Sequence, residues 1–156
     1  MIHYCVGDAT CPDIPGPKLI VHVCNNMGAW GKGFVLALSR RWRLPEECFR
    51  KWSSVGVYNN ILYTLGNSQL IQVESTIYVL NMIAQDGLYT RKGIIPLRYS
   101  YLQRCLETAA VHAKQMHATV HMPRIGCGLA GGKWSIVEEL IEYCLSGISV
   151  YVWDLK

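Results

Sequence analysis

The sequence Ala118-Thr-Val-His-Met122, followed by Gly126-Cys-Gly-Leu-Ala-Gly-Gly132, decides the fold that we expect of this chain. Residues Ala118–Met122 alternate and are rich in β-forming residues, which predicts a strand. Residues Ser135–Leu145 carry apolar residues at helical spacing, and Ile148–Trp153 are again β-branched and aromatic. The C-terminal quarter therefore reads as strand, glycine loop, helix and strand.

The glycine loop lies between the end of a strand and the start of a helix. Ser135 followed by Glu138 is a capping-box pattern for that helix. Glycines let main-chain N–H groups converge without obstruction by Cβ atoms, next to the positive end of the helix dipole, which favours an anion and above all a phosphate. The alternative is a tight turn without a ligand, although four glycines in seven positions exceed what a turn needs.

The rest of the chain continues the alternation of strands and helices. The other predicted strands are Ile2–Val6, Leu19–Cys24, Asn60–Leu65, Leu70–Val73 and Thr76–Ala84. The other predicted helices are Phe34–Trp42, Pro45–Trp52 and Pro96–Met116. We expect Asn60–Leu65 and Leu70–Val73 to form a hairpin around Gly66-Asn67. The pattern predicts an α/β fold, a three-layer α/β/α sandwich on a mixed, mostly parallel sheet of about six strands, as one domain over residues 1–156.

Three loops follow the ends of apolar strands: residues 25–33, 85–93 and 126–132. The first is a second glycine loop, Asn25-Asn-Met-Gly-Ala-Trp-Gly-Lys-Gly33. Ligands of such sheets bind beyond the carboxyl ends of the strands. The sequence therefore predicts one cleft with a glycine loop on either side.

Composition narrows the class of protein. Of the 156 residues, 51% are hydrophobic and 17% charged, which argues against disorder, and no run of about 18 apolar residues exists for a membrane span. Seven cysteines without a C-x-x-C pair indicate reduced thiols. The N-terminus carries no signal-peptide pattern, so we expect a cytoplasmic protein, with a nuclear location as the alternative. The net charge of +4 is compatible with an anionic ligand. No cluster of metal ligands stands out, so we expect no required metal and no cofactor.

Three phosphate-binding motifs fit the glycine loop incompletely. Gly126-x-Gly128-x-x-Gly131 matches the dinucleotide fingerprint, with Asp154 as a ribose acid, but a dinucleotide domain starts with this motif rather than ending on it. A P-loop is excluded because Trp134 stands where Ser or Thr is needed after Lys133. The spacing of Cys127 and Lys133 is that of cysteine phosphatases, which require arginine at the second position.

The order of several motifs resembles the macrodomain family over nearly the whole chain. They are Gly7-Asp8, His22-Val-Cys-Asn25, Gly28-Ala-Trp-Gly-Lys-Gly33 and Met122-Pro-Arg-Ile-Gly-Cys-Gly-Leu129 with Trp134. The branch most similar contains ADP-ribose 1″-phosphate phosphatases and terminal ADP-ribose protein glycohydrolases. The resemblance implies that the chain is a single macrodomain that binds ADP-ribose or a derivative.

The resemblance also implies roles for individual residues. Asp8, beside Ala9, would accept a hydrogen bond from the adenine amino group, and Asn25 would face the distal ribose. Gly31, Lys32, Gly33 and Phe34 would line the ribose and phosphates. The segment Ile125, Gly126, Cys127, Gly128, Leu129 and Ala130 would hold the diphosphate by main-chain N–H groups.

Residue types leave the chemistry open. A glycohydrolase of this branch uses lysine and aspartate, and the corresponding positions here hold Ile83 and Ala130, which excludes a lysine adduct. The phosphatase pattern offers His22 and Asn25 as catalytic residues, with Asp86 to orient water or a proton. A structural role is the alternative for each: a hydrogen-bonded strand histidine, a loop-capping asparagine and an exposed loop aspartate.

Three functions follow from the resemblance. The first is an enzyme that binds ADP-ribose and hydrolyses ADP-ribose 1″-phosphate or a related ADP-ribosyl ester. The second is a non-catalytic reader of ADP-ribosylated protein or nucleic acid, and the third is a hydrolase that removes ADP-ribose from such partners without lysine. No membrane partner is expected.

Overall fold

Six strands form one sheet in the computed structural model, which describes residues 1–156. They are β1 (Ile2–Val6), β2 (Lys18–Asn25), β5 (Ser68–Glu74), β6 (Ile77–Gln85), β7 (Thr119–Met122) and β8 (Val150–Asp154). Their order is β1-β8-β7-β2-β6-β5, and every neighbouring pair is parallel except β5 and β6, which are antiparallel. The predicted mixed, mostly parallel sheet is confirmed.

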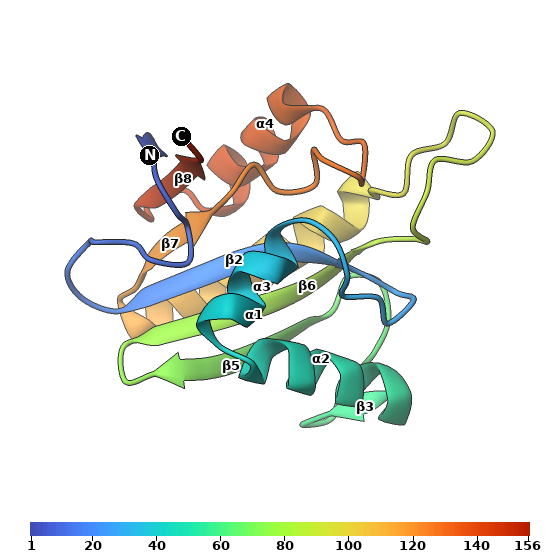
Figure 1. The fold of residues 1–156 in the computed structure, drawn as a ribbon. Coiled ribbons are helices and arrows are strands. Elements are labelled where there is room, and N and C mark those ends of the chain that lie inside the picture. The colour runs from blue at the N-terminus through green and yellow to red at the C-terminus, as the bar shows by residue number, and fades with distance from the viewer.

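Helices cover both faces of the sheet. Figure 1 shows α1 (Phe34–Arg41) and α2 (Leu44–Val55) in front and α3 (Tyr99–Met116) behind. Helix α4 (Trp134–Cys144) joins α3, because both contribute to the larger apolar core. Strand β2 alternates between the layers: Leu19 and Val21 belong to the larger core, while Ile20 and Cys24 belong to a smaller one under α1 and α2. The expected three-layer sandwich is confirmed, and its central strands are apolar because both of their faces are buried.

The predicted hairpin of Asn60–Leu65 with Leu70–Val73 is wrong. Strand β5 pairs with β6 instead, from Ser68 opposite Met82 to Glu74 opposite Ile77, so a tight turn over residues 75–76 joins them. Residues Ile61–Leu62 form the short strand β4, which pairs with β3 (Val57–Tyr58) around two asparagines with positive φ. That asparagine pair is a type I′ hairpin signal, and it was the better turn signal in the sequence.

Two predicted helix starts also differ from the structure. Helix α3 begins at Tyr99 rather than Pro96, because Leu97 and Arg98 remain extended and donate main-chain hydrogen bonds to Ala130 and Ala84. Helix α4 begins at Trp134, so Ser135 lies inside its first turn and makes no capping hydrogen bond. The expected capping box is therefore wrong. None of the helices combines the length and apolar character needed to cross a membrane.

Candidate functional site

A cavity of about 510 Å³ opens at the carboxyl edge of the parallel strands, within the range of small-molecule sites. Residues from all three predicted loops line it. From the first loop and its flanks come His22, Asn25, Gly31, Lys32, Gly33 and Phe34. From the last come Ile125, Gly126, Gly128, Leu129 and Ala130. The structure thus brings together the two glycine loops that the sequence singles out.

Four predicted site residues lie outside the cavity lining: Asp8, Ala9, Asp86 and Cys127. Asp8 is exposed, and its Oδ1 accepts hydrogen bonds from the amide and hydroxyl of Thr10, at 2.8 and 2.7 Å. Ala9 is only 3% exposed. The Cys127 thiol donates to the carbonyl of Ile125 at 3.4 Å, and burial raises its pKa. This thiol is therefore turned into its own loop.

The loop over residues 126–132 is a closed turn tied to the segment before α3. Gly132 N donates to Gly126 O at 2.8 Å, and Leu97 N donates to Ala130 O at 3.1 Å. A Cβ atom at Gly132 would lie 2.6 Å from Gly126 O, and one at Gly126 would lie 2.8 Å from Leu97 Cδ2. Gly128 differs because its Cβ direction is open space. Two of these glycines are needed for the turn, while Gly128 keeps the cavity floor clear.

Two loops beside the cavity have main-chain N–H groups without a partner in the protein. None of the N–H groups of residues 126–130 donates a hydrogen bond within the protein, and the same holds for residues 30–33. Gly126, Gly128, Leu129 and Ala130 line the cavity, as do all four residues 30–33. Gly31, Lys32 and Gly33 are exposed, as are Gly128 and Leu129, so water can satisfy these amides. The two rows therefore leave main-chain donors beside one cavity that a strong acceptor can use.

Side chains hold the first glycine loop in place. The Oδ1 atom of Asn25 accepts from the amides of Met27 and Ala29, at 2.9 and 3.0 Å, while Nδ2 donates to the Ala29 carbonyl at 2.9 Å. The Tyr63 hydroxyl accepts from Gly28 N and donates to the Asn25 carbonyl, each at 2.9 Å. The Asn25 side chain therefore acts mainly as a clamp on its own loop.

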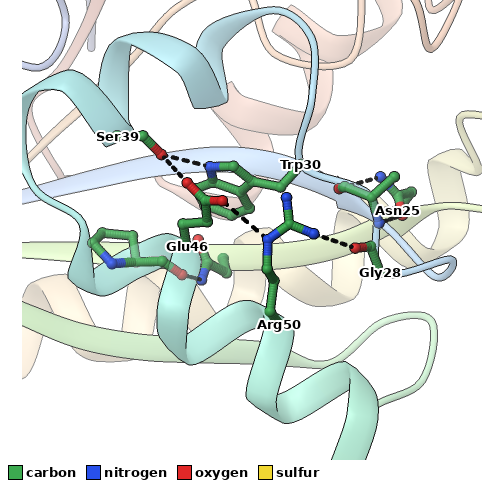
Figure 2. Close-up of polar contacts among 9 residues, drawn as sticks. Asn25, Gly28, Trp30, Ser39, Glu46 and Arg50 are labelled. Carbon is green, nitrogen blue, oxygen red and sulfur yellow. Dashed lines mark hydrogen bonds and ion pairs between the residues drawn. The ribbon is translucent and has the colours of Figure 1, made fainter.

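A second network connects this loop to α1 and α2 (Figure 2). Trp30 Nε1 donates to Ser39 Oγ, which donates to Glu46, each at 2.8 Å. Glu46 also accepts from Arg50 Nε at 3.0 Å, and Arg50 reaches the Gly28 carbonyl at 3.5 Å. The hydrogen bonds from Ser39 and Arg50 lower the pKa of Glu46. The loop is thus anchored by both helices and keeps a fixed shape.

The helix whose N-terminus opens into the cavity is α1. Its N-cap, Gly33, has φ 81° and ψ −145°, which L-residues with a Cβ rarely adopt, and Gly33, Phe34 and Val35 all line the cavity. The sequence instead predicts the positive end of α4 there. Lys133 and Trp134, at the start of α4, are not in the lining. The favourable helix dipole therefore comes from the other glycine loop.

His22 lies against the cavity wall in a fixed, neutral form. Gln69 Nε2 donates to the Cys48 carbonyl at 2.9 Å, and Asn81 Nδ2 donates to Gln69 Oε1 at 3.0 Å and to the Pro45 carbonyl at 3.3 Å. These carbonyl acceptors orient both amides, so Asn81 Oδ1 faces His22 Nε2 at 2.5 Å and requires it to carry the proton. Burial lowers the pKa of His22 to about 4, which the Asn81 hydrogen bond offsets only in part.

Asp86 is held by polar partners from two other parts of the chain, the first glycine loop and the segment before α3. Its Oδ1 accepts from Asn26 Nδ2 at 3.0 Å, its Oδ2 lies 3.6 Å from Arg98, and its amide donates to the Pro96 carbonyl at 2.9 Å. The aspartate therefore ties the middle loop to the first loop, and its carboxylate is half-exposed beside the cavity rather than inside it.

The structure adds lining residues that the sequence reasoning missed, among them Trp30, Tyr89 and Arg124. Arg124 pairs with Asp154 through two hydrogen bonds of 2.8 and 3.0 Å. Its guanidinium lies 5.2 Å from the ring centres of both Tyr4 and Trp134. In the sequence, the only sign that Arg124 belongs to the site was its position after Pro123, just beyond the end of a predicted strand. No group of three or more His, Cys, Asp or Glu side chains is placed to hold a metal ion.

Solved structures with the same architecture identify the class of protein. The macrodomain protein of Streptomyces coelicolor is 47% identical, with a TM-score of 0.86 over 99% of each chain. A protein from Bacteroides thetaiotaomicron is 46% identical, with a TM-score of 0.94 over 99% of this chain and 98% of that one. The chain belongs to the macrodomain family. No family model matches the sequence.

Three further relatives are less similar in sequence, and two of them are much longer than this chain. Chromodomain-helicase-DNA-binding protein 1-like of Mus musculus is 28% identical over 97% of this chain, which spans only 17% of that protein. An ADP-ribose 1″-phosphate phosphatase of Meyerozyma guilliermondii is 24% identical over 97% of this chain and 98% of that protein. The DarTG protein of Thermosipho africanus, solved in complex with ADP-ribose, shares the fold at 18% identity and TM-score 0.70, over 88% of this chain and 38% of that one.

Proposed function

We propose that the cavity binds ADP-ribose or an ADP-ribose derivative. The observation that carries this proposal is the two rows of unpaired main-chain N–H groups, residues 30–33 and 126–130, on either side of one cavity. A diphosphate offers many acceptor oxygens and negative charge to such donors, and the start of α1 adds its dipole. Membership in the macrodomain family and the named relatives support the same ligand.

The proposed pose follows the residues in space. The diphosphate would lie over the amides of residues 126–130, and the distal ribose would lie against residues 31–33 with Asn25 behind them. Lys32, which makes no ion pair, would add positive charge at the mouth. The adenine would reach beyond the cavity toward Asp8, whose Oδ2 atom makes no hydrogen bond within the protein.

Calorimetry with ADP-ribose tests the binding proposal. Gly128→Glu should fold, because no atom lies within 4 Å of the Cβ position, but its side chain would occupy the cavity and repel phosphate. We expect one-to-one binding by the wild type and a loss of about 100-fold or more in the variant, or about 3 kcal/mol. Ser135→Glu places the same side chain on α4 outside the cavity and should bind normally. Equal affinity in all three proteins would contradict the assignment of the loop.

A second proposal is hydrolysis of ADP-ribose 1″-phosphate, favoured by the phosphatase relative that matches this chain over nearly its whole length. Water would attack the phosphorus, the bond between phosphorus and the C1″ oxygen would break, and ADP-ribose and phosphate would leave. His22, Asn25 and Asp86 are the candidate residues. At neutral pH, His22 would accept a hydrogen bond rather than act as an acid, because its pKa is lowered to about 4. Asn25 would position the loop, and Asp86 would orient water from the rim.

Release of inorganic phosphate from ADP-ribose 1″-phosphate tests this second proposal. Asn25→Ala and Asp86→Asn should lower the rate, with ADP-ribose affinity measured in parallel to detect a disturbed loop. A wild-type protein that binds ADP-ribose but releases no phosphate would contradict the enzyme and favour a reader of ADP-ribosylated macromolecules. Release of ADP-ribose from modified protein or nucleic acid would favour the hydrolase without lysine, since Ile83 is fully buried and Ala130 carries no functional group.

A further inference from the structure

Strand β1 is an outer strand of the sheet, with β8 on one side and a free edge on the other. Val150 N donates to Met1 O at 3.1 Å, and Gly7 N donates to Asp154 O at 2.8 Å, so the odd-numbered residues along β1 direct their main-chain groups toward β8. Successive residues of a strand alternate in this direction. The even-numbered residues therefore turn their N–H and C=O groups outward: Ile2, Tyr4 and Val6.

The outward main-chain groups of β1 have no partner elsewhere in the fold. None of the hydrogen bonds formed by turns, loops and helix caps involves the main chain of Ile2, Tyr4 or Val6. The edge is also open to solvent, because Tyr4 is 47% exposed and Val6 is 65% exposed. An unpaired strand edge is a template on which another strand can pair.

The two outer strands of the sheet differ in how well they are protected. Folded proteins protect a sheet edge with lysine or other charged side chains, with proline, or with a bulge. The sequence of β1, Ile-His-Tyr-Cys-Val, has no lysine, acidic residue or proline, and its pairing with β8 runs without a register shift. The other outer strand, β5, has a register shift between Gln72 and Glu74, and Glu74 is exposed. Of the two edges, β1 is therefore the one that can accept a further strand.

We propose that β1 pairs with β1 of a second copy of this chain, antiparallel about a two-fold axis at Tyr4. In this register Tyr4 lies opposite Tyr4 of the second copy, and Ile2 lies opposite Val6 on either side of the axis. All of these residues face outward, so each opposed pair exchanges two main-chain hydrogen bonds, about six in total. No outward donor or acceptor of β1 is left unpaired. A two-fold axis makes the same edge serve both copies.

The side chains of β1 suit this pairing. No lysine, arginine or acidic residue lies on the strand, so the two copies meet without like charges opposite each other. Ile2 opposite Val6 is a β-branched pair, and Tyr4 opposite its equivalent is an aromatic pair, and both kinds stabilise neighbouring strands.

The surroundings of Tyr4 hold its ring in place and balance the nearest cation. The Tyr4 hydroxyl donates to Glu138 and accepts from Trp134 Nε1, the second at 3.0 Å. The Arg124 guanidinium lies 5.2 Å from the Tyr4 ring centre and is paired with Asp154 in its own copy. The arginine therefore brings no unbalanced positive charge to the two-fold axis.

The dimer is weak and leaves both cavities open. A paired edge of five residues is about 17 Å long, so the buried area lies at the low end of specific interfaces, and we expect a dissociation constant of about 10–100 μM. The two copies run antiparallel, so their carboxyl edges, and with them the cavities, point in opposite directions. Ligand binding at one cavity is therefore independent of the pairing.

Sedimentation velocity between about 5 and 500 μM protein tests the dimer, and we expect the wild type to pass from monomer to dimer over this range. Val6→Pro removes an N–H group that makes no bond within the sheet, and its ring occupies the place of the second strand. The variant should weaken the dimer about tenfold or more. The matched control, Val6→Thr, keeps the N–H group and the β-branched shape and should dimerise like the wild type. Urea unfolding shows whether both variants are folded.

An engineered disulfide tests the register without proline. His3 lies opposite Cys5 of the second copy in a non-hydrogen-bonded pair, whose Cα atoms are about 4.5 Å apart, within disulfide distance. Mild oxidation of His3→Cys should therefore give a covalent dimer, in which peptide mapping finds the introduced thiol bonded to Cys5. Cys5→Ser in the same background should abolish that bond.

Three results would overturn the pairing of β1. They are a wild-type protein that stays monomeric up to about 500 μM, a dimer that is as tight in Val6→Pro as in the wild type, and an introduced thiol that bonds to a cysteine other than Cys5. ADP-ribose binding, measured by calorimetry, is a separate result: its absence refutes the proposed function and leaves the dimer standing.

Discussion

Acidification from about pH 7.5 to about pH 5 should destabilise the fold through two buried histidines, His22 and His121. Burial lowers the pKa of each to about 4, from an ordinary value of 6.5. The folded protein therefore resists protonation that the unfolded chain accepts. The stability associated with the neutral rings is complete above pH 6.5 and is lost as the pH falls toward 4. At pH 5 each histidine costs about 2 kcal/mol, and the pair about 4 kcal/mol.

The contacts of His121 explain why it stays neutral and suggest the control. Trp153 Nε1 donates to His121 Nδ1 at 3.1 Å, and the Nε2 atom lies 2.7 Å from the Thr119 hydroxyl. A proton on Nδ1 would face the indole N–H, so two donors would oppose each other. Urea unfolding at both pH values measures the loss. His121→Gln should reduce the difference between the two pH values by about half, whatever its effect on stability at pH 7.5.

Two measurements would show that the two rings are not buried in the neutral form. A change in the free energy of unfolding below about 1 kcal/mol between the two pH values, or the same change in His121→Gln, would mean that these rings are not buried as neutral groups. Nuclear magnetic resonance can follow the ring protons themselves. A His22 ring that titrates near pH 6.5 in the folded protein would contradict the network through Asn81.

Two substitutions test the supports of the site. Gly132→Ala should lower the free energy of unfolding by about 1–3 kcal/mol and weaken ADP-ribose binding, because its Cβ would lie 2.6 Å from the Gly126 carbonyl oxygen. Urea unfolding measures the stability and calorimetry the binding. A variant as stable as the wild type would show that the loop is not closed as described. Asn81→Ala should lower the free energy of unfolding by about 3 kcal/mol, because it leaves His22 Nε2, Gln69 Oε1 and the Pro45 carbonyl without the Asn81 side chain as partner. A loss below about 1 kcal/mol in urea unfolding would contradict the buried network.

The architecture could be predicted because local patterns in this chain agree with the final burial. Strands β2 and β6 are apolar on both faces and lie inside the sheet, and each glycine loop follows a strand end. The pairing of the strands was harder to predict. Gly66-Asn67 and the true turn at residues 75–76 both interrupt the apolar pattern, so either could be the turn of a hairpin. The Gly66 amide is satisfied by Ile83 on another strand, which local sequence does not reveal.

The main-chain part of the candidate site could be predicted better than the states of its side chains. Glycine spacing indicates where N–H groups gather, because that depends on neighbours in sequence. The state of an ionisable side chain depends on distant partners: His22 is fixed by Asn81, 59 residues away, and Asp86 is bound by Asn26, 60 residues away. The same limit explains why Arg124, held between Tyr4 and Trp134, was missed.

We propose that main-chain amides of the two glycine loops hold the pyrophosphate of ADP-ribose. Titration of ¹⁵N-labelled protein with ADP-ribose, followed by amide chemical shifts, tests it most directly. We expect the largest shifts on the amides of residues 30–33 and 126–130. Saturable binding whose largest shifts lie elsewhere, or no shifts at all, would contradict it.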